Sequence, residues 1–268
     1  MDRTFDRVFV TPPGETYVDC VSRNPEHHTI DIFSARQQHA GYVRILKEHG
    51  IKVDVLPTHE NYPDSVFVQD TALVGERTGT AVLCRFGEPS RRGEEKLVEE
   101  RLETDGYRLE EIKAPGTLEG GDILVTDRDT VFVGISERTN NKGVNQLAEY
   151  FPDIEFVKVP VEKVFHLLSA VNFIGKGTLA ICPSMVDRDY FHGFDLLEIP
   201  EKQNSTYDNK PINMLYLGNK HVLMPDAYPG TEKILEENGY VPVTTNLSEF
   251  WKGDAGVTCP ILPLYREL

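Results

Sequence analysis

The sequence predicts a closed, pseudo-fivefold ring of ββαβ units, which is a propeller-like α/β fold. Three observations support this fold class. Five segments repeat the order strand, turn, strand, helix, strand; the last strands of most repeats stop at prolines; and one repeat is split between the two chain ends. Closure through the chain ends removes exposed sheet edges, which is a physical reason for the split. The alternative is an ordinary mixed α/β domain whose elements merely alternate.

The clearest repeat lies in the first half of the chain. We expect its elements at 65–74 (strand), 80–86 (strand), 90–103 (helix) and 107–112 (strand). Ser90 is the expected N-cap of the helix, because a hydroxyl at that position accepts hydrogen bonds from the first backbone N–H groups. Pro115 ends the repeat.

The other repeats follow the same order with different spacing. The second has a strand pair within 121–136, a helix at 141–151 and a strand at 154–159. The third has strands within 166–182 and at 195–199, joined by an intervening segment. The fourth has a hairpin within 212–224 with a tight turn at Gly218–Lys220, a helix from about Thr231 and a strand at 240–245. The fifth pairs 256–264 with 6–12, followed by a helix at 34–49 and a strand at 52–56.

The composition is that of an ordinary globular protein. The chain has 268 residues, 40% of them hydrophobic and 26% charged, and no linker or low-complexity tract divides it. We therefore expect a single domain over residues 1–268, with the fifth repeat closed by the N- and C-terminal strands. No apolar run approaches the roughly 18 residues of a membrane span, and the polar start is not typical of a secretory signal.

Charge and cysteine content narrow the partners and the compartment. The formal net charge of −15 argues against a nucleic-acid partner, because phosphate affinity comes mainly from Lys and Arg. An acidic surface also suits the attraction of a cationic small molecule, although solubility is its commoner role. Four widely spaced cysteines without a CxxC pair favour a reducing, cytoplasmic setting. The oligomeric state stays open, a homo-oligomer included.

Polar residues interrupt the predicted inner strands near their starts, where a buried ring should be apolar. They are Asp64, Asp70, Glu119, Asp122, His166, Asp254 and Cys259. In a ring the starts of equivalent strands converge, so these residues are expected to meet at the centre. Buried carboxylates need partners, and the planar guanidinium group matches paired carboxylates. The pattern therefore predicts a pocket for a cation, with a cysteine and a histidine beside it.

Each of these residues also has an ordinary structural explanation. Cys259 alone would more often be a small buried hydrophobic residue, and His166 alone a core histidine. Asp70 and Asp122 are compatible with capped turns or pairs with arginines, and Glu119 with an ordinary loop acid. The combination across separate repeats favours a functional site.

Several segments also resemble a known family. They are DSVFVQDTALV, EPSRRGE, APGTLEGGDIL, SERTNNKG, VFHLLSAVNF and DAGVTC. They resemble, in the same order along nearly the whole chain, segments of the dimethylarginine dimethylaminohydrolases, which belong to the guanidine-modifying pentein superfamily with the arginine deiminases and amidinotransferases. The resemblance implies a five-bladed α/β propeller with a central active site, in agreement with the repeats.

The resemblance also implies roles for individual residues. Cys259 matches the nucleophile of the family, His166 its acid/base, and Glu119 the acidic partner that orients the histidine. No metal and no cofactor is implied, and the Cys and His spacing gives no recognisable metal motif.

Further residues match the family's substrate contacts. Asp70 matches the carboxylate that grips the guanidinium nitrogens, and Asp254 lies near the same end. Gln69 stands where members of this branch typically carry Glu, which puts in doubt the preference for methylated over plain arginine; the amide still offers a hydrogen bond at the guanidinium site.

The amino-acid end of the substrate has its own set of matches. Arg91 and Arg138 match the arginines that hold the α-carboxylate. Asp64 matches the group near the α-amine, and Val21 matches a loop residue whose backbone carbonyl contacts that amine.

The activity implied is hydrolysis of N-methylated arginine to citrulline and methylamine or dimethylamine. A thiol with a pKa near the ordinary value of about 8.5 is mostly protonated at neutral pH, so the scheme needs activation by the substrate cation, by His166, or by both. The alternatives are arginine deimination with release of ammonia, transfer of the amidino group to another amine, and a non-catalytic pentein ring that acts as a binding protein.

Overall fold

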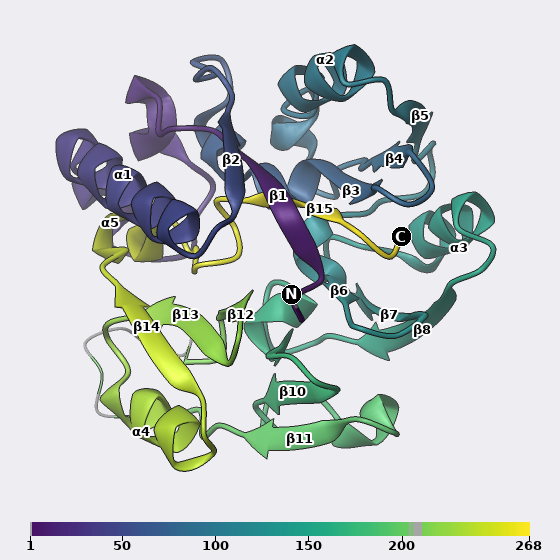
Figure 1. The fold of residues 1–268 in the computed structure, drawn as a ribbon. Helices are drawn as coiled ribbons and strands as arrows, with labels where there is room; N and C mark the ends of the chain where they lie inside the picture. Colours follow the sequence, from purple (N-terminus) through teal and green to yellow (C-terminus); the bar gives the residue numbers. More distant parts are fainter. Residues whose placement is uncertain (1, 204, 206–210) are drawn as a thin grey trace.

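Each blade of the ring is a three-stranded sheet whose second strand pairs antiparallel with the first and parallel with the third. The computed structural model describes residues 2–203, 205 and 211–268, and within these residues five such blades surround one axis (Figure 1). The four longer helices lie at the periphery of the ring. The predicted five-bladed fold is confirmed.

The first four blades follow one another along the chain. The first contains β3 (Ala72–Gly75), β4 (Thr80–Leu83), α2 (Lys96–Thr104) and β5 (Arg108–Glu111). The second contains β6 (Ile123–Val125), β7 (Thr130–Ile135), α3 (Asn141–Tyr150) and β8 (Glu155–Pro160). The third contains β9 (Val171–Phe173), β10 (Thr178–Ile181) and β11 (Asp195–Glu198). The fourth contains β12 (Leu215–Gly218), β13 (His221–Pro225), α4 (Pro229–Glu237) and β14 (Val241–Thr245).

The fifth blade joins the two ends of the chain. It contains β15 (Leu262–Tyr265), β1 (Phe5–Val10), α1 (Ile32–Glu48) and β2 (Lys52–Val55), and the short α5 (Ser248–Lys252) precedes it. β15 pairs antiparallel with β1, with Leu262 opposite Phe9, and parallel with β3, with Leu264 opposite Val74. The fifth and first blades therefore form one continuous six-stranded sheet, in which β15 lies directly beside β1 (Figure 1).

The burial of the strands explains their apolar sequences. All residues of β3 and β4 are buried, whereas the outer strands β2, β5 and β11 are exposed at both of their end residues. Clusters of buried aliphatic and aromatic side chains fill the space between the sheets and the helices. No helix in the described part of the chain is long and apolar enough to span a bilayer.

Several expected elements differ in their bounds, and among the inner strands β9 begins at Val171 and β15 at Leu262, later than the expected starts at 166 and 256. The strand expected at 65–74 is shorter, because the 3-10 helices Pro63–Val66 and Val68–Thr71 occupy its first part. The helix expected from Ser90 begins at Lys96, with Glu95 rather than Ser90 as its N-cap. Gly93 has a φ of +109°, which is outside the helical region and separates Ser90 from the helix.

Other local features agree with the expectations from the sequence. Asn219 and Lys220 both have positive φ angles, of 51° and 66°, as a two-residue type I′ hairpin requires. In the third blade the intervening segment between β10 and β11 contains the 3-10 helix Arg188–Phe191.

An ion-pair network joins the fifth and first blades over Phe9 of β1. Arg7 binds Asp54 at 2.5 Å and Asp105 at 2.6 Å, and Arg101 binds the same two carboxylates at 3.2 and 3.0 Å. Both guanidinium groups lie over the Phe9 ring, 5.2 and 5.0 Å from its centroid. Because each charge has two partners, the network stabilises more than an isolated surface pair.

We expect Asp54→Asn to lower the free energy of unfolding by about 1 kcal/mol, because Arg7 and Arg101 each lose a partner. The loss should shrink at 1 M salt, where partly exposed charges are screened. Urea unfolding at two salt concentrations measures both effects. Glu48→Ala is the control, since its pair with Arg44 is long, at 3.8 Å, and exposed; equal losses in the two variants would contradict the role of the network.

Candidate active site

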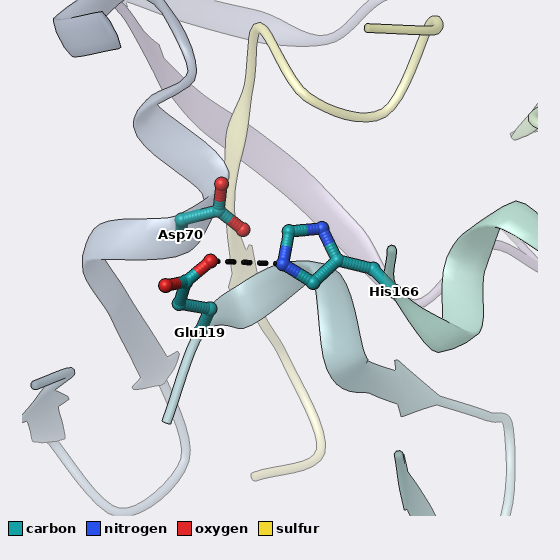
Figure 2. A group of neighbouring side chains, drawn as sticks. All are labelled: Asp70, Glu119 and His166. Atoms are coloured by element: carbon teal, nitrogen blue, oxygen red, sulfur yellow. Dashed lines mark hydrogen bonds and ion pairs between the residues drawn. The ribbon is translucent and has the colours of Figure 1, made fainter. Parts of the chain in front are cut away.

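Three of the inner strands are preceded by a 3-10 turn that carries or follows a polar residue. Asp70 lies in the turn Val68–Thr71 before β3. Glu119 directly precedes the turn Gly120–Asp122 before β6, and His166 precedes the turn Leu167–Ser169 before β9. Because the inner strands surround the axis, these turns bring the three side chains together (Figure 2).

A pocket opens at this point. Eight of the ten predicted site residues line it, and the two that do not are Glu119 and Gln69. Its lining residues are Val21, Asp64, Phe67, Asp70, Arg91, Arg138, Phe165, His166, Gly253, Asp254, Ala255 and Cys259. Residues from the N-terminal loop, from three blades and from the segment before β15 thus share one cavity.

Glu119 lies outside the pocket lining and contacts His166. Its carboxylate oxygen Oε2 is 2.9 Å from Nε2 of His166 (Figure 2), and its Oε1 accepts a hydrogen bond from the backbone N–H of Gly87 at 3.0 Å. The Glu119 side chain is completely buried. The contact between the two residues agrees with the orienting role expected for Glu119.

The charges around His166 decide its protonation state. Burial would lower the pKa of His166, but the carboxylate of Asp70, the hydrogen bond to Glu119 and the charge of Asp122 outweigh burial and raise the pKa to about 9. Burial likewise opposes ionisation of Glu119, but His166, Arg91 and Arg138 lower the pKa of Glu119 to about 2. His166 is therefore an imidazolium at neutral pH, suited to donate a proton.

Asp70 accepts hydrogen bonds from two sides and can still accept further ones. Its Oδ1 accepts a hydrogen bond from the backbone N–H of Gly121 at 2.8 Å, and its Oδ2 accepts one from Nη1 of Arg91 at 2.9 Å. A carboxylate offers about four lone-pair positions, so two stay available for a ligand.

Arg91 is buried among carboxylates. Its Nε and Nη2 bind Glu94 at 2.9–3.3 Å, its Nη1 binds Asp70, and the same nitrogen is 3.8 Å from Glu119. Arg138 is less engaged, because its only described ion pair joins its Nη1 to Glu119 at 3.6 Å. Of the two arginines predicted to meet an α-carboxylate, Arg138 therefore retains more free N–H donors.

Two of the predicted amine contacts lie together. The backbone N–H of Val21 donates to both carboxylate oxygens of Asp64, each at 3.1 Å. Asp64 is 3% exposed, and burial raises its pKa although Arg91 opposes the shift. An ammonium group bound here would offset part of this desolvation cost.

Asp254 has partners in the N-terminal loop. Its Oδ2 accepts hydrogen bonds from the hydroxyl of Ser22 at 2.7 Å and from the backbone N–H groups of Arg23 and Asn24 at 2.6 and 3.2 Å. The side chain lines the pocket as predicted, but these bonds fasten the loop that carries Val21. A guanidinium contact of Asp254 stays a prediction.

Gln69 does not reach this pocket, which corrects the prediction that it lies beside the guanidinium. It lines a second cavity, which also contains Thr258, Asn172 and Tyr216. Adjacent residues of a 3-10 turn point about 120° apart, so Asp70 and Gln69 face different cavities. The backbone N–H of Gln69 donates to the carbonyl of Cys259 at 3.3 Å, which ties the two turns together.

Two glycines allow the turns to approach so closely. A Cβ on Gly120 would collide with the backbone carbonyl of Gln69, and a Cβ on Gly121 would lie 2.5 Å from Nδ1 of His166. Asp122 then fixes the histidine turn, because its Oδ1 accepts a hydrogen bond from the backbone N–H of Leu167 at 3.0 Å.

Asp70, Glu119 and His166 offer ligand atoms within 4.8 Å of one another, which is close enough for a metal ion. In the structure His166 and Glu119 bind each other and Asp70 binds Arg91. A metal ion would have to compete with both cations for these groups. The donor set therefore fits an ion-pair cluster better than a metal centre.

The sequence reasoning missed two contributors to the site. Glu94 was expected in the first turn of a helix, but it is buried against Arg91; the spacing of three residues in RRGE was the available signal. Phe165 is the second: the centre of its ring lies 4.3 and 5.5 Å from the guanidinium carbons of Arg23 and Arg138 at the pocket, and no pattern in the sequence distinguishes it from a core aromatic residue.

Comparisons with known proteins agree with this arrangement. A profile of the family described as "N,N dimethylarginine dimethylhydrolase, eukaryotic" matches residues 16–266. An uncharacterised protein of Aeropyrum pernix is 42% identical and aligns over 100% of this chain and 98% of its own length. The N(G),N(G)-dimethylarginine dimethylaminohydrolase of Pseudomonas aeruginosa is 32% identical over 95% of this chain and 98% of its own. A solved structure of DDAH from Pseudomonas aeruginosa, a cysteine-to-serine mutant complexed with citrulline, has a TM-score of 0.87 at 32% identity and covers 97% of this chain and 99% of that chain.

The five-bladed ring and the Cys–His–carboxylate pocket at its axis define a hydrolase of the pentein superfamily that acts on guanidino groups. The profile and the Pseudomonas relative both span nearly the whole chain. The chain belongs to the dimethylarginine dimethylaminohydrolase family. The resemblance identified from the sequence is thus confirmed.

We expect His166 to stay protonated through neutral pH and to titrate at about pH 9. Glu119→Gln should lower the pKa of His166, because the neutral amide no longer favours the imidazolium. Side-chain NMR titration measures both values, with the resonance assigned by its loss in His166→Asn. A wild-type His166 that titrates near the ordinary value of about 6.5 would contradict the electrostatic account.

Proposed function

We propose that this protein hydrolyses N-methylated arginine to citrulline and methylamine or dimethylamine, and that its 268 residues form one catalytic domain. The observation that carries the proposal is the pocket in which Cys259, His166 and Asp70 meet, with Glu119 behind the histidine. Membership of the dimethylarginine dimethylaminohydrolase family supports the same substrate class.

The hydrogen-bonding groups of the pocket favour a methylated guanidinium. Arginine carries five guanidinium N–H donors, whereas asymmetric dimethylarginine has three, because one terminal nitrogen bears two methyl groups. Asp70 keeps about two accepting positions, Gln69 faces another cavity, and Asp254 is engaged by the loop. Phe67 and Ala255 offer apolar surface in the same pocket. A pocket with few free acceptors and with apolar surface therefore matches a substrate that has fewer N–H donors and carries methyl groups.

The first chemical step joins the enzyme to its substrate. The Cys259 thiolate attacks the guanidinium carbon, and the substrate cation beside the thiol favours loss of the thiol proton to solvent. His166 is already protonated and cannot accept that proton. Instead it donates its own proton to the departing amine as the carbon–nitrogen bond breaks, which leaves a thiouronium intermediate on Cys259.

The second step releases the product. His166, now neutral, accepts a proton from water as the water oxygen attacks the thiouronium carbon. The carbon–sulfur bond then breaks, Cys259 leaves as a thiolate, the remaining hydroxyl proton passes to solvent, and citrulline forms. Glu119 holds the imidazole in one orientation through both steps, and Asp70 keeps the planar carbon facing the sulfur.

The amino-acid end of the substrate has complementary partners. Arg138 is the proposed ligand of the α-carboxylate, with Arg91 adding the N–H groups that its own pairs leave. Asp64 and the backbone carbonyl of Val21 are proposed for the α-amine, and the contact of Asp64 with the Val21 N–H supports this position.

We expect asymmetric dimethylarginine and monomethylarginine to show a kcat/KM at least about tenfold above that of arginine, because differential binding of methyl groups supplies discrimination of this size. Citrulline formation from the three substrates measures the ratio directly. Arginine as the best substrate would contradict the proposal and indicate a deiminase.

The control for this assay is Cys259→Ser, which removes the nucleophile and is expected to abolish citrulline formation while the protein still folds. Near-normal turnover in this variant would rule out the covalent scheme. Transfer of the amidino group to an added amine, in place of citrulline formation, would indicate an amidinotransferase.

Arg138→Ala is expected to raise KM for dimethylarginine by about tenfold or more, with a smaller change in kcat, because a charge-assisted pair to the α-carboxylate is lost. A substrate without the α-carboxylate, dimethylagmatine, should show little change. Arg128→Ala is the matched control, since Arg128 binds the carbonyl of Gly193 away from the pocket. Equal changes for both substrates would mean that Arg138 is structural.

A further inference from the structure

Arg91 and a substrate guanidinium need the same oxygen atoms. Arg91 is 5% exposed and already donates from Nη1 to Oδ2 of Asp70. The same nitrogen is 3.8 Å from Oε2 of Glu119. A buried arginine that loses one carboxylate turns toward those that remain, because an uncompensated buried charge is costly. Free movement of Arg91 would therefore occupy the positions on Asp70 that the substrate requires.

Glu94 prevents this movement by holding Arg91 from the opposite side. Its Oε2 accepts hydrogen bonds from Nε at 3.1 Å and from Nη2 at 2.9 Å, and its Oε1 accepts a longer one from Nε at 3.3 Å, so one carboxylate holds two guanidinium nitrogens. The Phe86 ring lies 4.6 Å from the guanidinium carbon and covers one face of it. With two nitrogens on Glu94, Arg91 presents only Nη1 to Asp70.

We propose that Glu94 is a positioning residue that limits Arg91 to one contact with Asp70, so that Asp70 stays able to bind the guanidinium of the substrate. This inference rests on the proposed function, because it concerns the same pocket. Glu94 itself does not line the pocket, so its effect passes through Arg91 and Asp70.

The surroundings of Glu94 support a role beyond local structure. Its side chain is 1% exposed, and burial raises the pKa of Glu94 although the charge of Arg91 opposes the shift. Asp64 and Asp70 add like charges. A carboxylate at this point is costly to ionise, and its hydrogen bonds go to Arg91, which also binds Asp70.

The test compares two thiol reagents of similar shape. 2-Chloroacetamidine carries a planar cation that Asp70 can bind, whereas 2-chloroacetamide is neutral, and we expect both to alkylate Cys259, the one partly exposed cysteine of the described residues. Mass spectrometry follows the alkylation by each reagent. The ratio of the two rate constants measures how strongly Asp70 binds a cationic group, and it does not require turnover.

In Glu94→Gln we expect the amidine-to-amide ratio to fall by about tenfold, with the chloroacetamide rate within about twofold of wild type. In Glu94→Asp the charge is kept but withdrawn by one methylene, and we expect the ratio to fall as well, because the proposal requires position rather than charge. Glu95→Gln is the matched control: it removes the neighbouring charge, whose one described side-chain hydrogen bond comes from the backbone N–H of Gly93, and should keep the wild-type ratio. Thermal unfolding checks that each variant is folded.

A wild-type ratio in folded Glu94→Gln would overturn the inference, and so would a wild-type ratio in Glu94→Asp, since charge alone would then suffice. Citrulline assays on the same proteins separate this result from the proposed function. A wild-type enzyme that reacts selectively with the amidine but forms no citrulline would contradict the proposed function, while a reduced ratio in both Glu94 variants would still support the role of Glu94.

Discussion

Closure of the ring through β15, between β1 and β3, is the constraint on which the other features of the molecule depend. It brings Cys259, only a few residues before β15, to the axis that Asp70, Glu119 and His166 reach from other blades. Residues separated by most of the chain then share one small volume. Backbone pairing brings these residues together, and the side-chain contacts described above then fix their orientation.

The same convergence buries several ionisable groups in a small volume. Asp70, Glu94 and Glu119 all lie within 4 Å of Arg91, and His166 binds Glu119. Buried charges of this kind persist when each has an opposite partner. A positively charged substrate extends the pairing rather than disturbing it. The proposed chemistry therefore uses a charge balance that folding already requires.

The sequence predicted most of this arrangement because the repeats carry a periodic signal. The split fifth repeat and the hairpin at Asn219 and Lys220 were predictable from strand patterns and turn residues. The directions in which single side chains point were not predictable in this way. Gln69 and Asp70 are adjacent in the sequence, yet they face different cavities because both lie in a 3-10 turn. The alternation of apolar residues in this segment predicts a strand and gives no sign of that turn.

Two other differences have similar causes. Ser90 has the side chain of an N-cap, but the backbone at Gly93 delays the helix to Lys96. In the sequence Glu94 has the position of an acidic residue in the first turn of a helix, but tertiary packing buries it against Arg91. Local preference predicts what a residue can do, and the three-dimensional contacts determine which of those possibilities is used.

The glycine pair at the axis also has a consequence for how this protein can change. Gly120 and Gly121 pass so close to the Gln69 carbonyl and the His166 ring that no side chain fits at either position. A substitution at either glycine would displace the neighbouring turn, whereas the side chains of Phe67 and Ala255 are apolar and line the pocket. Mutant libraries that seek new amidine substrates should therefore leave the two glycines unchanged and concentrate their diversity on the apolar wall.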